Sequence, residues 1–160
     1  SVYGSGSEFV CVVNQEIVDD AHLSESYVYD KNTRRQIVFT APTARVLIVD
    51  DSKVNLGVAK GLLEEYGINA DTVESGMDAI KKVGRKHYDV IFMDHMMPEM
   101  DGISCLRAIK EYDSNANVIM VTAAGQSSKL MEALKSGAKE FICKPYEPEQ
   151  VINAIKEVLK

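Results

Sequence analysis

From about residue 45 onward, short apolar runs alternate along the chain with segments whose apolar residues recur at helical spacing. Short runs of this kind are typical of strands buried on both faces of a parallel sheet. The predicted strands cover residues 46–49, 70–73, 90–93, 118–121 and 141–143, and the predicted helices residues 58–66, 77–83, 103–109, 130–134 and 151–159. Strict strand–helix alternation predicts an α/β fold in which helices cover both faces of a parallel sheet.

The first forty residues have a different pattern. Strand-like runs at residues 8–13, 27–29 and 36–39 are separated by polar stretches, and together they hold too little apolar material for a core of their own. Ala41-Pro42-Thr43 reads as a linker. We therefore divide the chain into a short β-rich segment, residues 1–42, and a main domain, residues 43–160.

Polar residues stand at four of the predicted strand ends. Asp50 and Asp51 follow the first strand, Asp94 the third, Thr122 the fourth and Lys144 the fifth. Each residue alone is unremarkable, since an acidic pair after a strand is often only a helix N-cap. The carboxyl ends of parallel strands, however, meet at one edge of a sheet, and ligands bind there. The topology therefore predicts that these five side chains share one site.

This set of side chains suits a cation and a phosphoryl group. Three neighbouring carboxylates repel one another and require a cation, and a donor set made only of oxygen favours Mg²⁺. Phosphoryl transfer needs mainly positioning and charge neutralisation from a protein. We expect Asp94 to be the nucleophile, with Lys144 and Thr122 contacting phosphoryl oxygens.

The motifs around these residues resemble the receiver domain of two-component response regulators. The similarity is carried by Val-Leu-Ile-Val-Asp50-Asp51, Phe-Met-Asp94-His-Met-Met-Pro-Glu-Met-Asp-Gly102, Val-Thr122-Ala and Cys-Lys144-Pro145, in the order and spacing of that family. It covers roughly residues 43–160. The resemblance implies a flavodoxin-like, doubly wound sheet of order 2-1-3-4-5 with five helices.

The same resemblance assigns roles to individual residues. It implies that Asp94 is the phosphoacceptor and that Asp51, Asp94 and the backbone carbonyl of Met96 bind Mg²⁺, while Asp50 contributes through water. It implies a switch role for Thr122, followed by the ring of Phe141, although an ordinary core position for Phe141 carries equal weight. The bond between Lys144 and Pro145 is expected to be cis.

Three further residues lie close to the predicted site. Met96 and Ala124 occupy the two positions that modulate phosphoryl loss, and neither side chain can orient a water molecule, so we expect slow to moderate autodephosphorylation. His95 follows Asp94 directly. Because adjacent side chains of a strand point to opposite faces, we expect His95 to be a bystander.

Near the N-terminus, Tyr3-Gly-Ser-Gly-Ser-Glu-Phe-Val10 resembles the last glycine box and final strand of the ATP-binding domain of sensor histidine kinases. A flexible Gly-Ser spacer is the alternative. The kinase resemblance implies that the chain is a piece of a hybrid histidine kinase. Without the other parts of a nucleotide site, this chain alone is not expected to act as a kinase.

Composition and charge narrow the classes of protein to which the chain could belong. The chain of 160 residues is 46% hydrophobic, carries a net charge of −6 and has no basic patch, which argues against nucleic-acid binding. No apolar run approaches the roughly 20 residues of a membrane span. Cys11, Cys105 and Cys143 are widely spaced and odd in number, so reduced thiols in the cytoplasm are expected, with Cys143 as a small core residue.

The expected partners are a phosphohistidine domain of a histidine kinase and a His-containing phosphotransfer protein, which would dock near Asn55 and Val58. Phosphorylation would change the face formed by the fourth helix and fifth strand, and a homodimer through exposed strand edges stays open. Two alternatives compete. An aspartyl-nucleophile phosphatase would need an Asp-x-Asp pattern on its first strand, where this chain has Asp50-Asp51-Ser52, and an unphosphorylated interaction domain would not need the complete set of acceptor residues.

Overall fold

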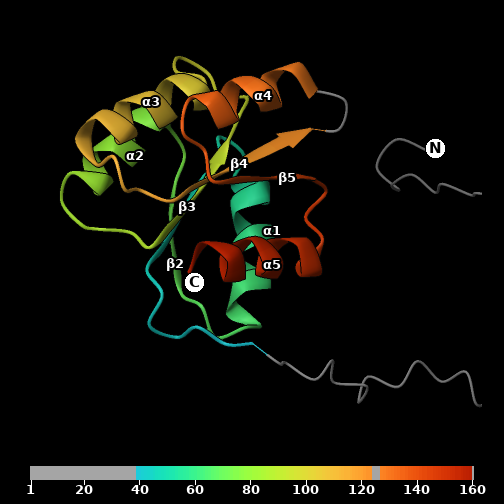
Figure 1. Cartoon of the computed structure of the whole chain (residues 1–160). Coiled ribbons are helices and arrows are strands. Elements are labelled where there is room, and N and C mark those ends of the chain that lie inside the picture. Colours follow the sequence, from blue (N-terminus) through green and yellow to red (C-terminus); the bar gives the residue numbers. More distant parts are fainter. Residues whose placement is uncertain (1–38, 124–126, 160) are drawn as a thin grey trace, which may run out of the picture. The chain divides into compact units, whose positions relative to one another are not determined.

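The computed structural model describes residues 39–123 and 127–159, with the side chains of 127, 128 and 130 excepted. Five strands alternate with five helices in this part of the chain (Figure 1). The elements are β1 (Val46–Val49), α1 (Lys53–Glu64), β2 (Ala70–Val73), α2 (Gly76–Val83), β3 (Val90–Asp94), α3 (Gly102–Tyr112), β4 (Val118–Ala123), α4 (Ser127–Lys135), β5 (Glu140–Lys144) and α5 (Pro148–Val158).

The strands form one parallel sheet of order β2-β1-β3-β4-β5. This arrangement confirms the predicted flavodoxin-like fold. Chain order reverses beside β1, so β1 and β3 lie next to each other although a strand and two helices separate them in sequence. Their carboxyl ends flank the point at which ligands bind in sheets of this type.

Helices cover the two faces of the sheet in two groups, with α1 and α5 on one side and α2, α3 and α4 on the other (Figure 1). Side-chain alternation along the strands divides the core in the same way. In β1, Ile48 packs with the α1–α5 group, whereas Leu47 packs with the α2–α4 group. Both faces of the central strands are therefore buried, which explains their continuous apolar sequence.

Among the helix starts that the structure describes, three have side-chain caps that satisfy free backbone N–H groups. The hydroxyl of Ser52 accepts from the Asn55 N–H at α1, and that of Ser75 accepts from the Asp78 N–H at α2. The carboxylate of Asp101 accepts from the first turn of α3. The cap at Ser52 explains why α1 begins at Lys53, earlier than the apolar periodicity predicted.

One expectation about burial is wrong. Cys143 is exposed rather than a core residue. It lies on β5, an edge strand of which only Ile142 is buried, against the α1–α5 layer. In α4 the periodic residues Met131 and Leu134 are 56% and 38% exposed, while the smaller Ala133 packs into the core. Periodicity identified the helix but not the face that it buries.

The predicted strand-like runs at residues 8–13 and 27–29 lie outside the described residues, as do Cys11 and most of the run at 36–39. The described part begins at Phe39, which packs with Ala41 and Ala44 against the α1–α5 side of the core. No helix among the described residues is long and apolar enough to cross a membrane.

Candidate functional site

Three carboxylates meet at the carboxyl ends of β1 and β3. Asp50 and Asp51 directly follow β1, Asp94 ends β3, and the pairing of Val49 with Met93 sets the two strands in register. Asp50, Asp51 and Asp94 each offer an oxygen atom, and these atoms lie within 4.8 Å of one another. Asp50 and Asp94 are buried, whereas Asp51 is exposed.

Lys144 provides the positive charge of this cluster. It ends β5, and its Nζ lies 2.7 Å from Asp50 Oδ2 and 3.1 Å from Asp94 Oδ1. Burial alone would lower the pKa of Lys144, but the hydrogen bonds and charges of the two carboxylates raise it above the ordinary value, so the side chain is an ammonium group. The peptide bond that follows, to Pro145, is cis.

The pKa of the Asp94 carboxyl group is set by opposing effects. Burial raises its pKa above the ordinary value, against the opposing effects of Lys144 and of the Met96 backbone N–H, while the nearby charge of Asp50 adds to the increase. The carboxylate is thus held close to other negative groups and away from water. A divalent cation would relieve that repulsion, and a donor set of hard oxygen atoms is the kind that Mg²⁺ prefers.

The remaining predicted residues lie around this cluster. Thr122 is buried on β4, one residue beyond Val121, the register partner of Asp94. Phe141 is half-buried on β5, opposite Met120, and packs against the α2–α4 side of the core. Met96 is 62% exposed in the loop after β3. Ala124 lies outside the described residues.

Backbone contacts hold the loop from β3 to α3 close to the end of β3. Gly102 donates its N–H to the carbonyl of His95 at 3.0 Å, and a Cβ atom on Gly102 would lie 2.1 Å from the carbonyl oxygen of Asp94. Glu99 within the loop has a φ of 64°, a conformation that few non-glycine residues adopt. The position of Asp94 is therefore tied to the start of α3.

Two residues that contact or face the site had no such role in the sequence interpretation. Asn55, in the first turn of α1, donates its side-chain amide to both oxygens of Asp50, at 3.1 and 3.2 Å. Tyr146, after the cis proline, is half-buried, and burial together with the charges of Asp50 and Asp94 raises its pKa. The position of Asn55, five residues after Asp50 and in the first turn of α1, is the only sequence signal for either residue.

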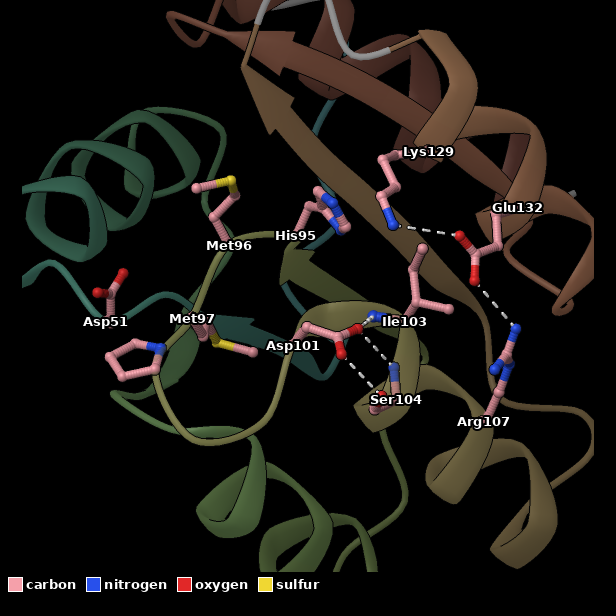
Figure 2. Close-up of a pocket in the computed structure, with 11 residues that line it drawn as sticks. Asp51, His95, Met96, Met97, Asp101, Ile103, Ser104, Arg107, Lys129 and Glu132 are labelled. Atoms are coloured by element: carbon pink, nitrogen blue, oxygen red, sulfur yellow. Dashed lines mark hydrogen bonds and ion pairs between the residues drawn. The ribbon is translucent and has the colours of Figure 1, made fainter.

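A cavity of about 710 Å³ adjoins the site but is not the site itself. It follows the loop after β3 and the groove between α3 and α4, where Glu132 pairs with both Lys129 and Arg107 (Figure 2). His95, buried directly after β3, lines this cavity, whereas Asp94 and Lys144 do not. The carboxylate cluster touches the cavity only through Asp51.

The raised pKa of Asp94 predicts how stability depends on pH. Ionisation of Asp94 costs folding free energy above the folded-state pKa, and the cost vanishes below the unfolded value of 3.8, where both states are protonated. In EDTA at pH 7, Asp94→Asn should therefore melt at a higher temperature than the wild type. The difference should fade as the pH approaches 3.8, and Mg²⁺ should stabilise the wild type more than the variant.

Asp89→Asn is the matched control for that measurement. The hydrogen bonds and charge of Arg45 lower the pKa of Asp89, so its ionised form stabilises the fold above the unfolded pKa. Asp89→Asn should therefore melt lower than the wild type at pH 7. A lower melting temperature for Asp94→Asn in EDTA would contradict the prediction.

Comparison with known proteins is consistent with this geometry. Residues 46–156 match the family model described as "Response regulator receiver domain". The chemotaxis protein CheY of Bacillus subtilis is 40% identical over 116 residues, which cover 72% of this chain and 97% of CheY. The hybrid signal transduction histidine kinase K of Dictyostelium discoideum is 32% identical, over 81% of this chain but only 11% of the kinase.

Among solved structures, the CheX–CheY–BeF3–Mg²⁺ complex from Borrelia burgdorferi is 37% identical. The match has a TM-score of 0.70 and covers 73% of this chain and 90% of that one.

Proposed function

The chain belongs to the response regulator receiver domains, the phosphoacceptor modules of two-component signalling, and we propose that Asp94 is the residue on which it carries the phosphoryl group. One observation carries this assignment. The Asp94 carboxylate lies with Asp50 and Asp51 inside a 4.8 Å cluster and has the Lys144 ammonium 3.1 Å away. A nucleophilic oxygen and a cation for the incoming phosphoryl group are thus side by side.

The proposed step is a direct transfer between two residues. A carboxylate oxygen of Asp94 forms a bond to the phosphorus of a phosphohistidine, and the phosphorus–nitrogen bond breaks. The imidazole nitrogen keeps the electron pair and later takes a proton, and Asp94 becomes an acyl phosphate. Lys144 is placed to bind one phosphoryl oxygen, and Thr122 is proposed to donate its hydroxyl to another.

We assign Mg²⁺ to the carboxylate cluster. Asp51, Asp94 and the backbone carbonyl of Met96 would hold the ion, with Asp50 contributing through water. When bound, the ion would neutralise negative charge on the phosphoryl group and on the cluster. The fit rests on oxygen donors that converge within 4.8 Å and on the Mg²⁺ named for the Borrelia complex.

The response to phosphorylation is proposed to pass through Thr122 and Phe141. Thr122 is buried at the site, and Phe141 is half-buried and packs against the α2–α4 side of the core. An inward movement of Thr122 would leave space for the Phe141 ring. The α4–β5 face would then differ between the two states and could be read by a partner.

We further propose that the chain is the receiver part of a hybrid histidine kinase, with residues 1–42 as the end of an ATP-binding domain plus linker and residues 43–160 as the receiver. The similarity to the Dictyostelium hybrid kinase over 81% of this chain supports this context. Its phosphoryl donor would be the phosphohistidine of a kinase, and its acceptor a His-containing phosphotransfer protein docked near Asn55 and Val58.

Intact-mass measurement with acetyl phosphate tests the assignment. The wild type should gain one phosphate only when Mg²⁺ is present, and Asp94→Asn should gain none. Asp89 directly precedes β3, at the end of that strand opposite to Asp94. Asp89→Asn should therefore be phosphorylated like the wild type. A gain that survives Asp94→Asn would refute the proposal, and steady release of phosphate from phosphate esters would favour the phosphatase alternative instead.

A further inference from the structure

Asn55 lies in the first turn of α1, and its side chain is turned toward the carboxylate cluster. Its Nδ2 donates to Asp50 Oδ1 at 3.1 Å and to Oδ2 at 3.2 Å. We infer that Asn55 is a positioning residue, whose amide holds the Asp50 carboxylate in place when Lys144 leaves it for the phosphoryl group. This inference rests on the proposed phosphorylation of Asp94.

Asp50 needs such a partner because its side chain is entirely buried. A buried carboxylate is costly unless hydrogen-bond donors replace the water that it has lost. Within the described part of the chain, three groups donate to it. They are the Ser52 backbone N–H at 2.9 Å, the Asn55 amide and the Lys144 ammonium. Asn55 is the only one of the three that contacts both oxygens.

Lys144 is shared between two carboxylates. Its Nζ lies 2.7 Å from Asp50 and 3.1 Å from Asp94, so the ammonium pairs with both carboxylates and more closely with Asp50. A phosphoryl group on Asp94 adds negative charge and new acceptors, which draw the ammonium away from Asp50. Oδ2 of Asp50 then keeps Asn55 as its side-chain donor. Without Asn55, Lys144 would be the sole side-chain donor to Asp50 among the described residues and would be harder to release.

A neutral amide suits this place better than a second cation. A lysine or arginine at position 55 would repel Mg²⁺ from the cluster, whereas an amide donates without adding charge. Asn55 contacts Asp50 rather than the proposed ion, so its effect on metal affinity would be indirect. Loss of such an outer partner typically weakens metal binding 10- to 100-fold.

The test is a calorimetric titration of the unphosphorylated chain with MgCl₂. Asn55→Ala and the nearly isosteric Asn55→Leu should each raise the Mg²⁺ dissociation constant about tenfold. Asn117→Ala is the matched control, since it removes an amide that donates to the carbonyl of Asp89, just before the amino end of β3 and away from the carboxylate cluster. It should stay within about twofold of the wild type. Wild-type Mg²⁺ affinity in either folded Asn55 variant would overturn the inference.

A kinetic measurement separates this inference from the proposed function. With acetyl phosphate at saturating Mg²⁺, both Asn55 variants should be phosphorylated on Asp94 about tenfold more slowly than the wild type. Because Mg²⁺ is saturating, weaker metal binding cannot explain that loss, so it would report on the release of Lys144. Unchanged rates would overturn the positioning role while leaving the function of Asp94 intact. Absence of phosphorylation in the wild type would instead refute the proposed function.

Discussion

Gly102→Ala should destabilise the domain by more than about 4 kcal/mol and remove phosphorylation on Asp94. The added Cβ atom would lie 2.1 Å from the carbonyl oxygen of Asp94, and 3.0 Å from both the Asp94 carbonyl carbon and the His95 Cα. All three atoms belong to the backbone, so no side chain can rotate to relieve the overlap. Either the end of β3 or the start of α3 must move.

That movement would reach the site directly, because Asp94 is the last residue of β3. The hydrogen bond from the Gly102 N–H to the His95 carbonyl would be strained by the same shift. Denaturant unfolding in EDTA measures the loss of stability, and intact mass after acetyl phosphate treatment measures the loss of function. Both losses are expected together.

Gly61→Ala is the matched control for Gly102→Ala. Gly61 is an exposed residue inside α1, and an added Cβ atom would meet nothing within 4 Å. Alanine costs less conformational entropy than glycine in a helix, so this variant should gain about 0.5–1 kcal/mol. If Gly102→Ala were as stable as Gly61→Ala, the close approach of α3 to β3 would be wrong.

Lys144→Met should cost about 3 kcal/mol of folding stability in the absence of Mg²⁺. The substitution keeps most of the side-chain volume and removes only the ammonium group, which is the one cation that the described residues place on the cluster. Asp50 would then be a fully buried carboxylate without a charged partner. Because the Lys144 side chain is still 23% exposed, we expect the low end of the range for broken buried pairs.

Added Mg²⁺ should recover much of that loss, since it supplies positive charge to the same carboxylates. Thermal melting of Lys144→Met with EDTA and with MgCl₂ measures both effects. Lys139→Met, which removes an exposed ammonium just before β5, should melt within about 2 °C of the wild type under both conditions. Equal melting of Lys144→Met and Lys139→Met in EDTA would contradict the proposed role of Lys144 in neutralising the cluster.

The sheet could be predicted from sequence because its strands are buried on both faces. Continuous apolar runs such as residues 46–49 and 90–93 leave few alternatives to a parallel sheet. Less could be predicted about the outer strands of the sheet. Cys143 looked like a core residue, yet β5 is an edge strand and leaves it exposed. The order of strands within a sheet depends on long-range pairing, which local pattern does not encode.

The site also has a part that could be predicted from the sequence and a part that could not. Asp50, Asp94 and Lys144 were predictable as neighbours because each lies at or directly after the end of a strand, and the carboxyl ends of parallel strands meet on one side of the sheet. The contact of Asn55 with both oxygens of Asp50 was not predictable. It depends on the angle at which α1 leaves β1, and that angle is set by packing against the sheet.

The sequence by itself determined the fold class and the end of the sheet at which the three carboxylates and Lys144 gather, because these follow from periodicity and strand direction. Only the tertiary structure decided which atoms meet. It places Lys144 closer to Asp50 than to Asp94, turns Asn55 onto Asp50, and leaves no room for a side chain at Gly102. These contacts depend on packing distances of a few ångströms between segments far apart in the chain.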